Sequence, residues 1–310
     1  MDNICAKTEK LCIGGVIVTY YPEASQFLKV FEAAVKQVDF LVIVNNSDVL
    51  IQSDLLKTTS QIISKKVEVI ENGQNLGVAV GLNIGLKALI GKGCSHFFML
   101  DQDSLIPDNM VLTLLKSLQV LNQQGHHVAA IGPAYFHIHL NKFAPFIKFG
   151  KFSLQKIQIE NNSRLFEAHF LITSGSLVTL EAIQNIGFME DELFIDLVDT
   201  EWCLRALDKH YKLYGHCGVV MSHSLGDKPV KIFGRKFIMH TPLRHYYLVR
   251  NSIHLLKKSY IPLNWRFIVF VMTLRSFMLY CFIAPNRIEH LRKMLRGFKD
   301  GLNGKLGRYN

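Results

Sequence analysis

Runs of apolar residues alternate with stretches of helically spaced apolar residues through the first third of the chain. The apolar runs are rich in β-branched residues and end in polar or turn-forming residues, which is typical of buried strands. The expected strands are 12–20, 40–48, 67–72 and 96–104, and the expected helices between and after them are 23–38, 50–64, 78–91 and 108–121. Apolar strands that alternate with helices predict a parallel sheet covered on both faces.

The pattern is less regular in the rest of the chain. The expected elements are a strand at 128–136, loops and edge strands over 137–165, a strand, a turn at Ser174-Gly175 and a helix within 168–180, a loop that becomes a helix over 194–211, and a strand at 213–224, with mostly helix after it. No internal repeat, low-complexity tract or clear linker divides the chain. One large domain with a basic helical tail is therefore the simplest partition.

The charge balance indicates which kind of partner the protein binds. Hydrophobic residues make up 49% of the chain and charged residues 19%, which fits a folded protein, but the formal net charge is +10. Most of the excess lies between residues 228 and 308. Such an excess favours an anionic partner: nucleic acid, an anionic membrane surface or a phosphate-bearing substrate. No nucleic-acid-binding motif is recognisable, so nucleic acid is not expected.

The cysteines and the N-terminus indicate the compartment. Six cysteines show neither a C-x-x-C pair nor zinc-ligand spacing, which predicts free thiols in a reducing environment. The opening residues MDNICAKTEK lack the apolar segment of a signal peptide. We expect a cytoplasmic protein.

The most apolar stretch is 267-FIVFVMTLRSFMLYCFIA-284, which has Arg275 in its middle and basic residues on both sides. A charge at the centre of a bilayer is costly, so a membrane span is not expected. Two interpretations stay open. The stretch is an amphipathic helix lying on the cytoplasmic face of a membrane, or an ordinary buried helix with Arg275 exposed or paired.

Two aspartates follow the fourth expected strand, in 97-FFMLDQDSL-105. Residues i and i+2 of a strand point the same way, so Asp101 and Asp103 can face one ligand. Close carboxylates are costly unless neutralised, and Mg²⁺ or Mn²⁺ bound through one or two carboxylates does this. The alternative is a turn in which Asp103 caps the helix that begins near Pro107.

Glycines and asparagines gather in 72-NGQNLGVAVGLNIG-85, between an expected strand and an expected helix. Small residues let a ligand approach the backbone, and a helix N-terminus favours phosphate. The stretch is not the G-x-G-x-x-G of a dinucleotide fold. The alternative is a loop followed by a closely packed helix.

Three carboxylates lie within six residues of 194-FIDLVDTEWCLRA-206, namely Asp196, Asp199 and Glu201. A carboxylate placed where a loop becomes a helix can serve as a general base when burial tunes its pKa. N-capping and a Glu201–Arg205 pair four residues apart explain part of this cluster without any chemistry. Further on, His223 ends an expected strand, where it is either a metal ligand or a structural residue.

In this order and spacing, these elements resemble family 2 glycosyltransferases with the GT-A fold. The similarity extends to the bacterial rhamnosyltransferases that build O-antigen or other surface polysaccharides, and it covers roughly residues 12–255. It implies a Rossmann-like α/β fold with a mostly parallel sheet flanked by helices, and a basic amphipathic helical tail. The implied parts are a catalytic domain over 1–255, with a nucleotide-binding half of about 10–125 and an acceptor half of about 126–255, and a membrane-associating tail over 256–310.

The resemblance also implies roles for single residues. Asp199, matched to the acid of the family's E-D-x-D signature, is the implied catalytic base, although Val198 stands where the family has Glu. Asn45 stands where the family has Asp. The implied metal ligands are Asp103, Asp101 and His223. The implied nucleotide-binding residues are Thr19, Tyr20, Asn45, Asn46, Asn75, Gly77, Asn83 and Asp101. The implied donor- or acceptor-binding residues are Gln102, Ser174, Gly175, Glu201, Trp202 and Arg250.

The reaction implied by the resemblance is inverting transfer of L-rhamnose from dTDP-L-rhamnose, assisted by Mg²⁺ or Mn²⁺. The acceptor is a hydroxyl of a glycan on polyprenyl diphosphate, at the inner face of a bacterial cell membrane. The alternatives are a UDP- or GDP-hexose donor, or a non-catalytic membrane-bound glycan-binding protein. A haloacid-dehalogenase-like phosphatase fits poorly, because 226-GDKPVK-231 ends in Lys where that family needs an acid.

Overall fold

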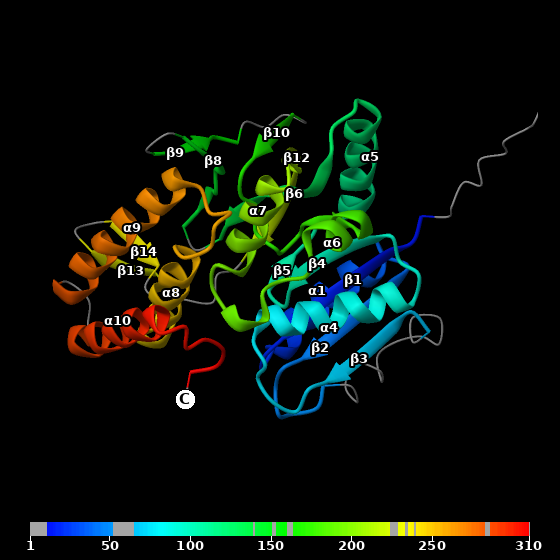
Figure 1. The fold of residues 1–310 in the computed structure, drawn as a ribbon. Helices are drawn as coiled ribbons and strands as arrows, with labels where there is room; N and C mark the ends of the chain where they lie inside the picture. The colour runs from blue at the N-terminus through cyan, green and yellow to red at the C-terminus, as the bar shows by residue number, and fades with distance from the viewer. Residues whose placement is uncertain are drawn as a thin grey trace, which may run out of the picture.

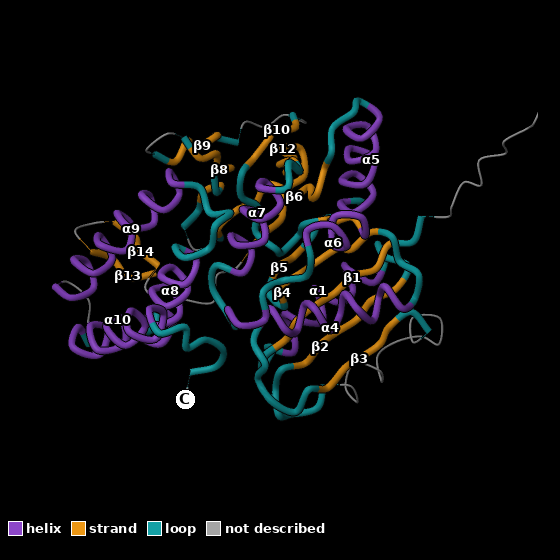
Figure 2. The backbone as a smooth tube through the Cα atoms, viewed as in Figure 1, coloured by secondary structure: helices purple, strands orange, loops and turns teal. Residues whose placement is uncertain are grey.

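A central sheet with helices on both faces organises the computed structural model of the chain (Figures 1 and 2). The structure describes residues 11–51, 65–138, 140–150, 153–159, 164–223, 229–232, 235–238, 240–282 and 286–309. The expected helix at 50–64 lies outside the described residues from position 52 onward.

The main sheet runs in the order β10-β12-β6-β11-β4-β1-β2-β3, with β5 beside β12 and β7 beside β6. Neighbours within β4-β1-β2-β3 and the pair β12-β6 are parallel, whereas β11 runs antiparallel between β6 and β4. The strands of this sheet are β1 (Ile13–Thr19), β2 (Phe40–Asn45), β3 (Val67–Glu71), β4 (His96–Asp101), β5 (Ser104–Leu105), β6 (Val128–His137), β7 (Lys142–Phe143), β10 (Leu165–Ala168), β11 (Leu177–Thr179) and β12 (Lys212–His223). Two separate hairpins are β8 (Phe146–Phe149) with β9 (Leu154–Ile157), and β13 (Pro229–Ile232) with β14 (Arg235–Ile238).

The helices divide into those that cover the sheet and those that follow it. The first group is α1 (Ala24–Val35), α4 (Val78–Gly91), α5 (Met110–Gln123), α6 (Leu180–Ile186) and α7 (Val198–Asp208), with the short 3-10 helix η1 (Asp191–Leu193) before α7. The second group is α8 (Pro242–Leu255), α9 (Leu263–Phe282) and α10 (Arg287–Leu302).

Alternation along the strands assigns the helices to the two faces. In β1, Val16 packs in the cluster formed with α4, α6 and α7, and the next residue, Ile17, packs in the cluster formed with α1 and α5. Phe97 and Phe98 of β4 divide between the two clusters in the same way. Successive side chains of a strand point to opposite faces, so apolar residues at every position bury both faces of the sheet.

The expected mostly parallel sheet flanked by helices is confirmed, and the four expected strands of the first third are present. The expectation for 168–180 is wrong in its order, because the strand β11 comes after the turn and runs directly into α6. Gly175, at φ +83°, turns the chain so that β11 enters the sheet antiparallel to β4. The described cysteines are free thiols, as expected: Cys12, Cys94, Cys203 and Cys217.

Helix α4 lies directly on β1 because two of its residues are glycines. A Cβ added to Gly85 would come 2.1 Å from a methyl of Val16, and one added to Gly81 would come 2.7 Å from a methyl of Val18. The closely packed helix left open for 72–85 is therefore present. The contact fixes the N-terminus of α4 beside the end of β1.

The helical tail packs on α8 through a second pair of glycines. Gly297 and Gly301 of α10 face the backbone of α8, where added Cβ atoms would lie 2.5 Å from the Tyr246 carbonyl oxygen and 2.7 Å from that of Arg250. The boundary predicted at residue 255 thus falls between two helices in close contact. No helix among the described residues is long and apolar enough to cross a membrane.

We expect Gly297→Ala to lower the free energy of unfolding by about 1–3 kcal/mol, because its Cβ would meet a backbone atom that cannot rotate away. Urea unfolding followed by circular dichroism measures this change. Gly91→Ala at the end of α4 is the control, since its Cβ would meet nothing within 4 Å. The control should be neutral or stabilising by up to about 1 kcal/mol.

Candidate active site

A cavity of about 710 Å³ opens at the carboxyl ends of β1 and β4, where open α/β sheets bind their ligands. The loop before α7 forms its opposite wall. The cavity is lined by Val18, Thr19, Tyr20, Asn46, Asn75, Gly77, Val78, Asp101, Gln102, Asp103, Tyr135, His137, Ile172, Thr173, Ser174, Phe194, Ile195, Asp196, Leu197, Val198, Asp199 and Arg244.

Asp101 and Asp103 both line this cavity, but not by alternation along one strand. β4 ends at Asp101, and Asp103 lies in the turn that leads to β5. The turn is tied to its neighbours by side chains: the Gln102 amide exchanges hydrogen bonds with the Tyr20 backbone at 2.7 and 3.2 Å, and the Ser174 hydroxyl accepts one from the Asp101 N–H at 2.9 Å. Capping by Asp103 is excluded, because the N-cap of α5 is Asn109.

The loop before α7 has an unusual backbone. Phe194, Asp196 and Leu197 have φ of 65°, 62° and 62°, values that non-glycine residues rarely adopt. The Asn251 amide on α8 donates to the carbonyls of Leu193, Ile195 and Asp196 at 2.8–3.0 Å. A backbone held in this way by the surrounding structure is a common feature of functional sites.

Arg244, at the start of α8, closes the same wall. Its guanidinium Nε donates to both carboxylate oxygens of Asp196, at 3.0 and 3.3 Å. Arg244 is the only lysine or arginine among the described residues that line the cavity. Arg244 therefore places one positive charge on the cavity wall that also carries the carboxylates of Asp196 and Asp199.

Asp199 lies in the first turn of α7 with its carboxylate at the cavity. Its pKa is raised from 3.8 to about 7, mainly by burial and also by the negative charges of Asp101 and Asp196, while hydrogen bonds from the Thr200 N–H and hydroxyl act in the opposite direction. A carboxylate with a pKa near neutrality can both hold and release a proton at physiological pH. This is the property that a general base needs.

The raised pKa also predicts that Asp199 costs stability. A carboxyl whose folded pKa exceeds its unfolded value is harder to ionise in the folded state, so the cost grows from about pH 4 to about pH 7 and is constant above. We expect Asp199→Asn to be more stable than wild type by about 1–2 kcal/mol near pH 8, with a smaller gain near pH 5. Urea unfolding in EDTA at both pH values tests this.

Asp208→Asn, at the exposed end of the same helix, is the matched control. Its effect on the free energy of unfolding should be small and equal at both pH values. An Asp199→Asn variant whose gain did not change with pH would contradict the raised pKa.

The structure brings together at the cavity the majority of the residues that the family resemblance implied. These are Thr19, Tyr20, Asn46, Asn75, Gly77, Asp101, Gln102, Asp103, Ser174 and Asp199. Asn75 and Asn46 also shape the loop before α4: the Asn75 side chain accepts from the Gly77 N–H at 2.9 Å, and Asn46 donates to the Gly77 carbonyl at 3.0 Å.

Six implied residues do not line this cavity, namely Asn45, Asn83, Gly175, Glu201, Trp202 and Arg250. Asn45 donates to Glu71 and to the Val49 carbonyl at 2.6 and 2.7 Å. The Asn83 side chain donates to the Met189 carbonyl and to the Asp191 carboxylate, and it accepts from the Met189 N–H. These buried amides join neighbouring segments of the fold.

Glu201 and Trp202 of α7 contact other segments of the chain instead of the cavity. Glu201 is buried and forms an ion pair with Arg205 at 2.7 Å, and it accepts a 2.6 Å hydrogen bond from the Tyr260 hydroxyl. Trp202 donates to the Gly187 carbonyl at 2.9 Å. The Glu201–Arg205 pair expected from their spacing is therefore present.

Arg250 is fully buried beneath the loop that forms the cavity wall. It donates to the carbonyls of Leu193, Glu192 and Gly307, and stacks against Tyr247. Its contacts thus position the loop from behind. For His223, the structure gives the backbone, which pairs with Ser104 next to Asp103.

The donor set at the cavity suits a hard divalent cation. Asp101 and Asp103 offer carboxylate oxygens, which are the ligands that Mg²⁺ and Mn²⁺ prefer, and both are partly buried. Within the described ranges, one tight group of three potential ligands occurs elsewhere, at Glu190, Glu192 and His254. There Lys258 contacts Glu190 at 2.7 Å, so one of the two carboxylates is already paired with a cationic side chain.

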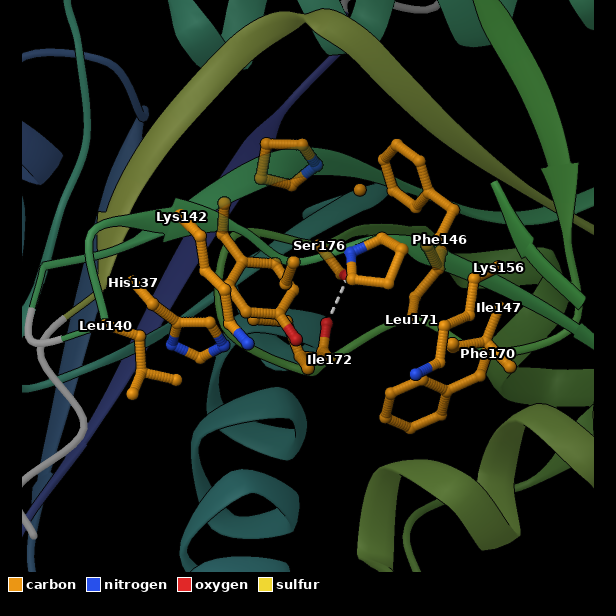
Figure 3. Close-up of a pocket in the computed structure, with 15 residues that line it drawn as sticks. His137, Leu140, Lys142, Phe146, Ile147, Lys156, Phe170, Leu171, Ile172 and Ser176 are labelled. Atoms are coloured by element: carbon orange, nitrogen blue, oxygen red, sulfur yellow. Dashed lines mark hydrogen bonds between the residues drawn. The ribbon is translucent and has the colours of Figure 1, made fainter. Parts of the chain in front are cut away.

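A smaller cavity of about 290 Å³ adjoins the main one and shares Tyr135, His137 and Ile172 with it (Figure 3). Its walls are largely apolar, and Lys142 and Lys156 reach in from opposite sides. Asp199 and burial together raise the pKa of Tyr135 to about 12, so this hydroxyl stays protonated beside the carboxylate.

Sequence reasoning gave no role to several residues at these walls. Asp196 was noted only as a member of the acidic cluster, and Arg244 only as part of the basic excess. Their pairing across 48 positions leaves no local signal. Tyr135 and His137 come from β6 and the start of the expected loop region, where alternation along the strand directs them to the cavity side.

Together, the doubly covered sheet, the carboxylates at its strand ends and the cavity between them define a glycosyltransferase with the GT-A fold. The profile of Glycosyl transferase family 2 matches residues 15–187, and the chain belongs to this family. It is 33% identical over 301 residues to the dTDP-rhamnosyl transferase RfbF of Shigella flexneri, covering 96% of this chain and 98% of that protein.

Solved structures agree on the fold. The crystal structure of GalNAc-T7 with UDP, GalNAc and Mn²⁺ has a TM-score of 0.57 at 11% identity, covering 90% of this chain and 59% of that one. The S. aureus TarS 1–349 structure has a TM-score of 0.53 at 13% identity, covering 94% and 81%.

Proposed function

We propose that the protein transfers L-rhamnose from dTDP-L-rhamnose to a hydroxyl of a lipid-linked glycan, with inversion at the anomeric carbon. The observation that carries the choice of donor is the 33% identity to a dTDP-rhamnosyl transferase over nearly the full length of both chains. The alignment covers 98% of that relative and therefore includes the segments at the cavity walls, where the sugar and the nucleotide are proposed to bind.

Asp199 is the proposed general base. It accepts the proton of the acceptor hydroxyl as that oxygen attacks the anomeric carbon from the face opposite the nucleotide. Its pKa of about 7 matches a group that must gain a proton during the reaction and lose it afterwards. The hydroxyl of Tyr135, protonated and close by, is placed to orient the acceptor.

Asp101 and Asp103 are the proposed ligands of Mg²⁺ or Mn²⁺, with His223 as a candidate third ligand. A bound cation would stabilise negative charge on the departing nucleoside diphosphate. Arg244, held by Asp196, supplies a fixed positive charge on the facing wall. Asn46, Asn75 and Gly77 place polar backbone and side-chain groups around the nucleotide at the N-terminus of α4.

The adjoining cavity with Lys142 and Lys156 is the proposed acceptor side. It adjoins the donor cavity at Tyr135, whose pKa is raised by burial and by the negative charge of Asp199. Two lysines at its walls suit an acceptor that carries phosphate, as a polyprenyl-diphosphate-linked glycan does.

The test is release of nucleoside diphosphate from a panel of donors (dTDP-L-rhamnose, UDP-hexoses and GDP-hexoses) with a lipid-linked acceptor present. We expect release from dTDP-L-rhamnose above all others, together with a rhamnosylated product detected by mass spectrometry. Faster release from a UDP- or GDP-hexose would overturn the donor and leave the fold and the base in place. No release from any donor would contradict the proposal as a whole.

A further inference from the structure

Helix α9 presents a continuous apolar stripe to solvent. Six of the seven large apolar residues exposed on its described part share one face of the helix, and the seventh, Met272, lies on the other side. Leu263 is 80% exposed and Phe270 is 60% exposed. The stripe consists of Leu263, Phe267, Phe270, Val271, Leu274 and Met278. Large apolar side chains gathered in this way usually mark an interaction surface.

Helix α10 repeats the arrangement. One face, with Met294, Gly297 and Gly301, is buried against its neighbours. A second face is an exposed apolar stripe of Ile288, Leu291, Leu295, Phe298 and Leu302. The remaining face is basic, and its exposed residues include Arg292, Arg296 and Lys299. Figure 1 shows α9 and α10 together at the end of the molecule opposite β3, and the two helices contact each other.

The positive charge of α9 and α10 indicates which kind of partner binds the two apolar stripes. Helices α9 and α10 contain seven lysines and arginines against two acids, and one of these acids, Asp300, is buried and paired with Arg296 at 2.9 Å. A second copy of the chain would bring the same positive charges together. An anionic lipid surface would meet them with phosphates and take up the apolar stripes.

We propose that α9 and α10 dock the enzyme on an anionic lipid surface. The apolar stripes lie about 5–10 Å deep at the boundary between headgroups and lipid chains, and the arginines and lysines contact lipid phosphates. Arg275, four residues after Val271 and therefore beside the stripe, reaches the headgroups with its long side chain.

An apolar groove of about 310 Å³ lies between α9 and the catalytic wall, on the side of α9 away from the stripe. Met272 and Ile268 of α9 line one side, and Leu197 and Thr200, which flank Asp199 in the sequence, line its inner end. Leu197 lines the active-site cavity as well.

The test is flotation of the full-length protein with vesicles that contain phosphatidylglycerol, compared with vesicles of phosphatidylcholine alone. We expect binding to the anionic vesicles that weakens as salt is raised. Phe270→Asp with Leu274→Asp and Phe298→Asp should weaken it more than about ten-fold. Arg275→Gln with Arg292→Gln and Lys299→Gln should also weaken binding, and should make it less dependent on salt.

The matched control is Leu112→Asp with Val120→Asp on α5, where both side chains are 47% exposed and lie outside the proposed face. It should float like wild type. Asp199→Asn should also float, since docking does not depend on catalysis. The stripe variants should retain nucleoside diphosphate release with a water-soluble acceptor, which shows that they are folded and separates loss of docking from failure of the proposed function.

Two outcomes would overturn the proposal. One is a stripe variant that floats as well as wild type. The other is concentration-dependent self-association in light scattering that the stripe substitutions abolish, with no binding to either vesicle, because that result would assign the face to a second copy of the chain.

Discussion

Asp199→Asn is expected to lower kcat by about 10²–10⁴-fold while leaving donor binding nearly unchanged. The amide keeps the size of the carboxylate and cannot accept a proton from the acceptor hydroxyl. In the wild type, the rate should rise with pH through the pKa of about 7, because the ionised carboxylate is the active form. Steady-state rates of nucleoside diphosphate release, measured across pH with donor and acceptor varied separately, test both statements.

Asp208→Asn is the control on the same helix, since Asp208 lies nine residues after Asp199 and is exposed at the end of α7. It should leave the rate and its pH profile unchanged. If Asp199→Asn retained wild-type turnover, or lost donor binding and turnover in equal measure, the carboxylate would not be the base.

Asp103→Ala and Asp101→Ala are each expected to reduce turnover by about 10³-fold, with weaker donor binding, because each would remove a proposed oxygen ligand of the cation. EDTA should inactivate the wild type, and added Mn²⁺ or Mg²⁺ should restore it. The variants should need higher metal concentrations than the wild type for whatever rate remains. Calorimetric titration of the nucleoside diphosphate with and without metal measures the loss in binding.

Asp108→Ala, an exposed aspartate in the segment after β5, controls for the loss of a negative charge near the site. It should bind metal and donor like wild type. Full activity of the wild type after exhaustive chelation would instead show that the two cavity carboxylates act without a cation.

The apolar pattern predicted the sheet well because burial on two faces requires apolar residues at every strand position. Pattern alone could not place β11, whose entry depends on the turn at Gly175 and on neighbours distant in sequence. In 168–180, the chain offers one apolar stretch on each side of the turn. Which of them joins the sheet is decided by pairing with β4 and β6.

The candidate site shows the same limit at the level of single side chains. Motifs indicated the segments, but residues two apart on a helix point to nearly opposite sides. Asp199 therefore lines the cavity, while Glu201 joins Arg205 and Tyr260 in the interior. Arg250 lies in a segment that the motifs selected, yet its contacts are with backbone carbonyls behind the wall. Such assignments need the three-dimensional neighbours.

The last residues of the chain return to the catalytic half. The Gly307 N–H donates to the Glu192 carbonyl at 2.8 Å, and the Tyr309 N–H donates to the Tyr247 hydroxyl at 2.8 Å (Figure 1). Removal of residues 303–309 would take away one partner of Arg250, the Gly307 carbonyl, and leave its buried charge less satisfied. Loss of this segment should thus lower the free energy of unfolding, although it lies far in sequence from the residues at the cavity.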